Sequence, residues 1–378
     1  MIPIYKPHFT KDNLKYAHEA IDSTWVSSKG EYITKVEENL SRIYSIGDIR
    51  INKALTTSNG TTALHLIARL IKEKYPKINK IIVPNNCYIA AWNAFLFDKN
   101  YIIEAVETNI ETWNIDLEIL YEVLSKSDIE TTALLIVHNL GNIINVPQIL
   151  RDWKNLVIVE DNCEGFMGKY EDYNSGSISF ASAISFFGNK NVTSGEGGAI
   201  ISSNNNQGYL YKLRSQGQSD VRFIHDELGY NYRMTNVQAA ILYGQLKDYI
   251  YIQQKKDELF YKYKKLFSDI DEIEFQKIDD NTQHSNWMFG IRIKNNKNYN
   301  DIEKFFKSNY IEARPMFYSI NTHKHLKEVV CHGGFNIAEK LNNECVILPS
   351  YLDLQNYEIM HIVNTIKLFI LSSHEKSI

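Results

Sequence analysis

The stretch that decides the fold reads SFFGNKNVTSGEGGAI and spans residues 185–200. It continues a β-prone apolar run that begins at Phe180, and its glycine-rich turn opens a second apolar run, Ala199 to Ser202. Lys190 is therefore expected on a short connection between two strands. A lysine held on such a turn and shielded by two phenylalanines can form a Schiff base with an aldehyde. The alternative is an ordinary solvated loop lysine, and the rest of the sequence decides between the two.

Upstream of this stretch, strand-like apolar runs alternate with segments of helical spacing. Strands are expected near residues 53–57, 81–83, 102–106, 133–138 and 156–160, and helices near 10–23, 33–44, 61–74, 90–97 and 117–125, with a short helix from Pro147. This alternation predicts an α/β fold with a mostly parallel sheet covered by helices on both faces. Ligands bind such sheets where the carboxyl ends of strands meet loops.

Beyond Gly229 the pattern changes. One long helix is expected from about Asn236 to Phe267, followed by an acidic and polar segment over residues 269–283. A further strand (288–293) and helices (301–308 and 356–371) complete the chain. We therefore expect a large domain over residues 1–250 and a smaller C-terminal α/β domain over residues 251–378.

Composition and charge suggest no nucleic-acid or membrane partner. The 378 residues are 44% hydrophobic and 23% charged, as in ordinary globular proteins, and the net charge of −4 offers no basic field for nucleic acid or an anionic membrane. No apolar run has the length of a membrane span or forms a signal peptide, which predicts a cytoplasmic protein. The four cysteines are scattered, as in a reducing compartment. Cys331–His332 lacks a second pair at ligand spacing, so no metal site is expected.

Two strand ends carry residues with either a chemical or a structural use. Asp161 ends an apolar strand, where a buried acid needs a cation, and a protonated pyridine nitrogen is one such partner. The alternative is that Asp161 caps a following helix, with Glu164 completing a capping box. Small and hydroxyl-bearing residues from Thr57 to Thr62 join a strand to a helix, as in a phosphate site or an ordinary helix cap.

Other side chains at the same edge fit one ligand. Tyr88 could stack on a flat ring, although core packing is its default role. His138 could contact a cofactor, although a satisfied structural histidine is favoured. The Gly195–Gly198 turn lacks nucleotide-loop spacing and leads into a strand, which indicates that it presents Lys190. A flat pyridine aldehyde carrying a phosphate would use the lysine, the acid, the aromatic face and the phosphate cup together, and pyridoxal phosphate is such a molecule.

The motifs, taken in order along nearly the whole chain, resemble those of the DegT/StrS family of nucleotide-sugar aminotransferases. This family is a branch of the fold-type I, aspartate aminotransferase-like enzymes that use pyridoxal phosphate. The resemblance rests on Trp25–Gly30, Asn59–Thr61, Glu160–Asp161, Ser185–Lys190, Gly195–Gly198, Gly229–Met234, Ala313–Pro315 and Leu348–Ser350.

The resemblance implies a role for each matching position. Lys190 would bind the cofactor covalently and carry the proton, Asp161 would pair with the ring nitrogen, and Glu164 would lie near the ring hydroxyl. The remaining cofactor contacts would be Tyr88 on the ring and Gly60, Thr61 and Ser185 on the phosphate. Asn231 would reach the phosphate of the neighbouring subunit's cofactor, which implies a homodimer with shared sites. Trp25, Arg314 and Phe317 border the expected sugar-nucleotide pocket.

The implied reaction transfers the amino group of L-glutamate to C4 of a nucleotide-linked 4-keto-6-deoxyhexose, most like the GDP-perosamine synthases. Viosamine formation on a UDP- or dTDP-linked sugar, amination of a 3-keto sugar, and a non-catalytic relative remain alternatives. The family's C3-dehydratase branch carries His in place of this lysine, so Lys190 argues against that reaction.

Overall fold

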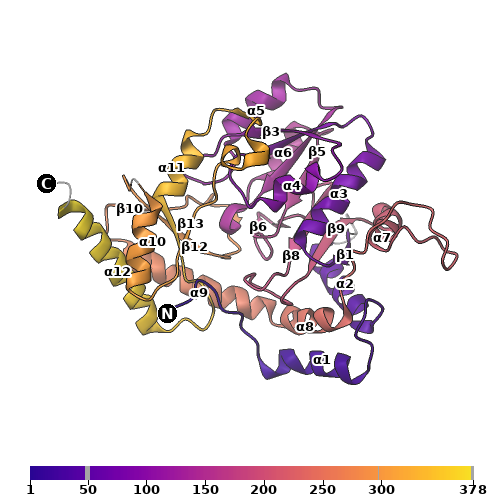
Figure 1. Cartoon of the computed structure of the whole chain (residues 1–378), viewed down its shortest axis with the longest axis horizontal. Helices are drawn as coiled ribbons and strands as arrows, with labels where there is room; N and C mark the ends of the chain where they lie inside the picture. The colour runs from indigo at the N-terminus through magenta and orange to yellow at the C-terminus, as the bar shows by residue number, and fades with distance from the viewer. Residues whose placement is uncertain (47–51, 297, 376–378) are drawn as a thin grey trace.

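The computed structural model describes residues 1–46, 52–296 and 298–375. A large sheet organises the fold (Figure 1), with the strand order β1-β9-β8-β5-β4-β2-β3-β14. Its strands are β1 (Asn52–Thr57), β2 (Lys80–Pro84), β3 (Ile102–Val106), β4 (Thr132–Val137), β5 (Val157–Asp161), β8 (Ala181–Ser185), β9 (Gly198–Ser203) and β14 (Val330–His332). Neighbours from β8 to β14 run parallel, whereas β9 is antiparallel to both β8 and β1. The predicted α/β class and mostly parallel sheet are confirmed.

Helices cover both faces of this sheet. Helices α3 (Gly60–Lys74) and α4 (Ala90–Leu96) pack on one face, and α5 (Leu117–Lys126) and α6 (Val146–Asp152) pack on the other. In β4, Ala133 and Leu135 face the first layer while Leu134 and Ile136 face the second. The strand is thus apolar throughout because successive side chains point to opposite, equally buried faces.

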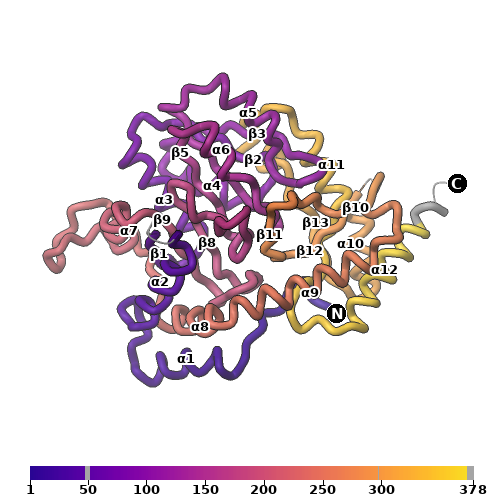
Figure 2. The backbone as a smooth tube through the Cα atoms, turned by 180° about the vertical axis from the view of Figure 1, so that it is seen from behind, coloured from indigo at the N-terminus to yellow at the C-terminus, as the bar shows by residue number. Residues whose placement is uncertain are grey.

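A smaller antiparallel sheet forms a second unit, with the order β10-β12-β15-β13. Its strands are β10 (Ile273–Phe275), β12 (Phe289–Ile293), β13 (Arg314–Pro315) and β15 (Cys345–Leu348), and its helices are α9 (Tyr249–Phe267), α10 (Tyr299–Ser308), α11 (Asn336–Glu344) and α12 (Asn356–Glu375). A third, three-stranded sheet joins β6 (Lys169–Tyr170), β7 (Tyr173–Asn174) and β11 (Thr282–Gln283). Figure 2 shows α9 running beneath the small sheet toward α8.

Three further helices lie at the other end of the molecule. These are α1 (Lys11–Asp22), α2 (Glu31–Tyr44) and α7 (Gln207–Arg214), and α7 with the loop after it projects away from the small unit (Figure 1). Helix α8 (Asn236–Lys247) packs against α1 and α2. None of the helices in the described ranges combines the length and the apolar character that crossing a membrane requires.

The single helix expected from Asn236 to Phe267 is wrong, because the chain breaks at Asp248 into α8 and α9. The amide of Asn13 in α1 donates to the carbonyl of Gly244 (2.9 Å) and to the carboxylate of Asp248 (2.8 Å). The Asp248 N–H bonds the carbonyl of Gln245 instead. A residue 231 positions away thus takes the acceptor that would continue the helix. The acceptor belongs to a glycine, and a β-carbon at Gly244 would lie 2.5 Å from the Asn13 carbonyl oxygen, so the glycine allows α1 to approach here.

The C-terminal part of the chain returns to the large sheet. Strand β14 pairs in parallel with β3, and Ile320 and Leu326 join the core beneath α3 and α4. The expected division near residue 250 stays a prediction, and this returning segment packs with the N-terminal unit.

Candidate active site

Lys190 lies on the connection between β8 and β9, as predicted. The connection is closed by backbone bonds from Phe186 N–H to the Gly197 carbonyl (2.8 Å) and from Ser194 N–H to the Phe186 carbonyl (3.0 Å). The Thr193 hydroxyl donates to the same Phe186 carbonyl (2.9 Å). The Lys190 N–H donates to the Phe187 carbonyl (2.9 Å). These bonds hold the lysine on a folded turn rather than on a loose loop.

A cavity of about 320 Å³ opens beside this turn. Its walls include seven of the predicted site residues, namely Gly60, Thr61, Tyr88, Asp161, Glu164, Ser185 and Lys190. They come from the ends of β5 and β8, the start of α3 and the segment after β2. The fold therefore gathers at one strand edge the groups that the sequence places far apart.

The start of α3 forms one end of the cavity. Asn59 caps the helix and exchanges side-chain bonds with Thr62, so the helix-cap interpretation is correct. Among the described residues, the N–H groups of Gly60 and Thr61 find no acceptor, and both residues line the cavity. A β-carbon at Gly60 would lie 2.8 Å from the Cys163 sulfur and 3.0 Å from Ser185 Cβ. The cavity wall thus carries two helix N–H groups without an acceptor, an arrangement suited to an anion.

Two buried carboxyl groups form the floor. Burial raises the pKa of Asp161, while its bond from the Cys163 N–H and the nearby Lys190 oppose the rise. Burial raises the pKa of Glu164 to about 7, although the Leu140 N–H donates to it at 2.7 Å. The capping-box interpretation is wrong, because turns rather than a helix follow Asp161.

Of the predicted aromatic, sugar-site and dimer residues, Tyr88 lines the cavity and the others do not. Tyr88 is 60% exposed and lies at the cavity wall, so core packing is excluded, and its ring meets Phe317 edge-on at 6.4 Å. Trp25, Arg314 and Asn231 do not line the cavity in the single chain. Trp25 is 61% exposed, and Arg314 forms an ion pair with Glu312.

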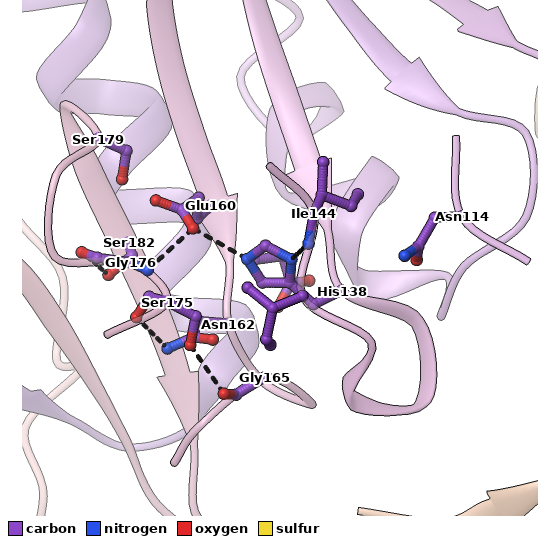
Figure 3. Close-up of polar contacts among 12 residues, drawn as sticks. Asn114, His138, Ile144, Glu160, Asn162, Gly165, Ser175, Gly176, Ser179 and Ser182 are labelled. Atoms are coloured by element: carbon purple, nitrogen blue, oxygen red, sulfur yellow. Dashed lines mark hydrogen bonds and ion pairs between the residues drawn. The ribbon is translucent and has the colours of Figure 1, made fainter. Parts of the chain in front are cut away.

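His138 has the structural role that was favoured for it (Figure 3). Its Nε2 lies 2.9 Å from Glu160, and its Nδ1 accepts from the Ile144 N–H at 3.2 Å, which places the proton of a neutral ring on Nε2. Glu160 also accepts from the Gly176 N–H (2.8 Å). The pair is fully buried beneath the strand end and outside the cavity.

Trp287 and Glu196 also line the cavity, although neither was predicted from the sequence as a site residue. The Lys190 Nζ lies 3.8 Å from the centre of a Trp287 ring. Trp287 lies in a polar segment just before β12, and the only local signal for it is a large aromatic side chain among polar neighbours. Across the described ranges, no group of three or more His, Cys, Asp and Glu side chains is arranged to hold a metal ion.

The cavity fits pyridoxal phosphate in three respects. Asp161 is a buried acid with no cationic hydrogen-bond partner among the described residues, which suits a protonated ring nitrogen. The amine-bearing Lys190 lines the same cavity, and so does the start of α3, where two N–H groups without an acceptor suit a phosphate. Asp161, Lys190, Gly60, Thr61 and Ser185 would hold these parts of the molecule.

Known proteins match over nearly the whole chain. The GDP-perosamine synthases of Escherichia coli O157:H7 and Vibrio cholerae are 33% and 30% identical, each over 97% of this chain and 98% of the relative. A putative sugar aminotransferase from Streptococcus pneumoniae shares the fold with a TM-score of 0.88 at 19% identity, covering 100% of this chain and 99% of that one.

The family profile described as DegT/DnrJ/EryC1/StrS aminotransferases matches residues 7–367. It confirms the family resemblance, the fold type, the aminotransferase class and the use of pyridoxal phosphate expected from the motifs. This chain therefore belongs to the DegT/DnrJ/EryC1/StrS aminotransferase family.

Proposed function

We propose that this chain transfers the amino group of L-glutamate to C4 of a nucleotide-linked 4-keto-6-deoxyhexose and forms a 4-amino-4,6-dideoxyhexose. A GDP-linked sugar of the perosamine type is the first candidate, because relatives named GDP-perosamine synthase match at 27–33% identity. The observation that carries the proposal is the convergence of Lys190 and Asp161 on one cavity with the open start of α3.

Bound pyridoxal phosphate supplies an aldehyde that takes up amino groups and a ring that withdraws electrons from the reacting carbon. Asp161 keeps a proton on the ring nitrogen. Lys190 Nζ moves a proton from the α-carbon of glutamate in one half-reaction and delivers a proton to the sugar carbon that becomes the amine in the other. Glu164 holds the ring hydroxyl, Tyr88 covers the ring, and Gly60, Thr61 and Ser185 bind the phosphate.

Other substrates share this machinery. Amination of UDP- or dTDP-4-keto-6-deoxyglucose would use the same cofactor residues, and so would amination of a 3-keto sugar. A relative named GDP-4-keto-6-deoxy-D-mannose 3-dehydratase is 26% identical, but the resemblance implies His at the position of Lys190 in that branch. A non-catalytic relative would be expected to lose some cofactor residues, whereas seven predicted site residues here share one cavity.

The proposal includes a homodimer with shared sites. Asn231 is exposed and lies outside the cavity of its own chain, as a residue that serves a neighbouring subunit would. Trp25 is also exposed, and its carbonyl accepts from Asn236 (2.7 Å), the first residue of α8. Trp25, Arg314 and Phe317 stay the candidates for the sugar-nucleotide pocket.

The test uses Lys190→Ala with Lys77→Ala as the control, because Lys77 is an exposed lysine paired with Glu130 on the surface. The wild-type protein and the control should turn yellow with pyridoxal phosphate, and borohydride should fix the cofactor on Lys190. Lys190→Ala should lose transamination by at least about 100-fold and show no such adduct. Full activity of Lys190→Ala, or no colour in the wild type, would refute the proposal.

The substrate is tested separately. Glutamate-dependent amination should be measured on GDP-, UDP- and dTDP-linked 4-keto-6-deoxyhexoses, with NMR of each product to locate the new amine. The proposal expects turnover on the GDP-linked sugar and an amine at C4. An amine at C3, or turnover on only the other nucleotides, would replace the substrate while leaving the cofactor chemistry in place.

A further inference from the structure

The amine of Lys190 rests on an aromatic face. Its Nζ lies 3.8 Å from the centre of a Trp287 ring, well inside the range in which an ammonium group is attracted to an indole. Trp287 is 7% exposed, and it lines the same cavity as Lys190. The indole is therefore shielded from water, which strengthens such a contact.

Hydrogen bonds hold both the indole ring and the backbone carbonyl of Trp287. Its Nε1 donates to the carbonyl of Asn189 at 2.8 Å, and Asn189 directly precedes the lysine. The Trp287 carbonyl accepts from Lys256 Nζ at 2.7 Å. The Tyr5 hydroxyl donates to the Lys190 carbonyl at 3.0 Å from the other end of the chain. The ring and the lysine backbone are thus fixed relative to each other.

The bond from Lys256 to the Trp287 carbonyl requires a buried amine, which costs folding free energy. The side chain is fully buried in α9, its Nζ donates to the carbonyls of Trp287 and Ser350, and the rings of Tyr5 and Phe260 lie 5.4 and 5.5 Å away. In the described part of the chain, no carboxylate forms an ion pair with it, and burial lowers its pKa well below the usual value. A buried lysine without an acid destabilises a fold, so its position calls for a compensating use.

We propose that Trp287 is a positioning residue whose indole face receives the Lys190 ammonium whenever the amine is not covalently engaged, with Lys256 fixing the indole. The inference rests on the proposed role of Lys190. Receiving the charged form helps the amine retain the proton that it removes from carbon. The other titratable groups that line the cavity with this amine are Tyr88, Asp161, Cys163, Glu164 and Glu196, and the Tyr5 hydroxyl contacts the lysine backbone.

The experiment uses the cofactor-free protein, so it does not depend on activity. Lys190 is acylated with an amine-selective reagent between pH 6 and 10, and the modified peptide is quantified by mass spectrometry in wild type, Trp287→Leu and Trp287→Phe. Because only the neutral amine reacts, losing the indole should lower the midpoint of labelling by about half a pH unit and speed labelling about threefold at pH 7. Trp287→Phe should fall between the two, since phenyl is the weaker cation acceptor. Lys77 in each protein serves as the internal control.

Two outcomes would overturn the proposal. One is an unchanged labelling profile in Trp287→Leu. The other is faster labelling at every pH with the same midpoint, because that pattern means only that the cavity has opened. Cooperative urea unfolding of each variant verifies that the fold is retained.

Lys256→Met tests the second half of the proposal, because methionine keeps the apolar stem and removes the donor. The pH midpoint of Lys190 labelling in Lys256→Met should fall, but by less than in Trp287→Leu. The double variant should have the same midpoint as Trp287→Leu alone. The role of Lys256 would be overturned if Lys256→Met labelled Lys190 with the wild-type pH dependence. It would also be overturned if the midpoint shifts of the two single variants added fully in the double variant. Failure of the proposed function would show instead as full activity of Lys190→Ala or as no colour in the wild type with pyridoxal phosphate.

Discussion

Glu164 makes the stability of the cofactor-free protein depend on pH, because burial beside Asp161 and Lys190 raises the pKa of its carboxyl to about 7. In the unfolded chain the pKa of a glutamate is about 4.5, so between these two values the folded state binds more protons than the unfolded state. A rise in pH through this window therefore destabilises the fold, and below it the penalty disappears. The full penalty above pH 7 is roughly 3 kcal/mol.

Glu164→Gln should remove that pH dependence. The variant should gain up to roughly 3 kcal/mol in unfolding free energy at pH 8, and the gain should shrink as the pH falls to 5. Urea unfolding of the cofactor-free protein measures this difference. Glu303→Gln on the exposed face of α10 removes the same charge and should stay within about 0.5 kcal/mol of wild type throughout. If the difference in unfolding free energy between Glu164→Gln and wild type stays constant from pH 5 to 8, Glu164 does not titrate in this window.

At the scale of single residues, the sequence predicted which side chains would meet at one cavity where a strand end provided the context. Lys190, Asp161 and Glu164 all reached the cavity, but the choice between a helix cap and a ligand group at Asp161 depended on whether a helix follows. The fold, and not local composition, rules out the helix cap, and the ligand role stays a prediction. Trp287 meets Asn189 across 98 positions, and no local pattern reports such a contact.

At the scale of elements, α3 combines two functions at its start. Asn59 satisfies one helix N–H through its cap, and Gly60 lets the backbone approach Ser185 and Cys163 so closely that a β-carbon would have to displace them. The free N–H groups and the helix dipole are then available to an anion. The close approach that Gly60 permits therefore also limits which residues can replace it.

Gly60→Ala should weaken binding of pyridoxal phosphate by about tenfold or more, because a shift of the Cys163–Ser185 wall narrows the phosphate end of the cavity. Gly208→Ala in α7 is the matched control, because nothing lies within 4 Å of the added β-carbon. The control should bind the cofactor normally and gain up to about 1 kcal/mol in stability. Absorbance titration measures the affinity, and equal affinities for the two variants would contradict a phosphate site at Gly60.

Elements with strong periodicity were predicted closely, as in α3, α5 and β3, because burial on one or two faces leaves a pattern in the sequence. The elements β13 and β14 were missed because two- and three-residue strands are too short for a pattern. The long helix was divided by Asn13, whose amide competes for one carbonyl from a distant helix. Short strands and breaks of this kind are set by tertiary contacts that act after the local preferences.

At the scale of the whole molecule, two distant units meet at Lys190. The turn between β8 and β9 belongs to the large sheet, whereas Trp287 lies two residues before the small-sheet strand β12 and Lys256 belongs to α9. Exposed apolar side chains gather on the loop after α7, where Phe223 and Leu228 are each 78% exposed. A second subunit that covers this loop would also bring Asn231 toward a neighbouring cavity, as the proposed dimer requires.

The shared-site arrangement makes a quantitative prediction. Lys190→Ala and Asn231→Ala should each be strongly impaired as homodimers, because each lacks one contribution to every site. In a mixed dimer one site carries both changes, and the other combines the intact Lys190 of one subunit with the intact Asn231 of its partner. Co-expression of the two variants with different tags, at equal levels, should therefore restore about one quarter of wild-type activity in the whole mixture and about one half in purified mixed dimers. If Asn231 serves the cavity of its own chain, no intact site can form, and the mixture will have no more than the averaged activity of the two variants.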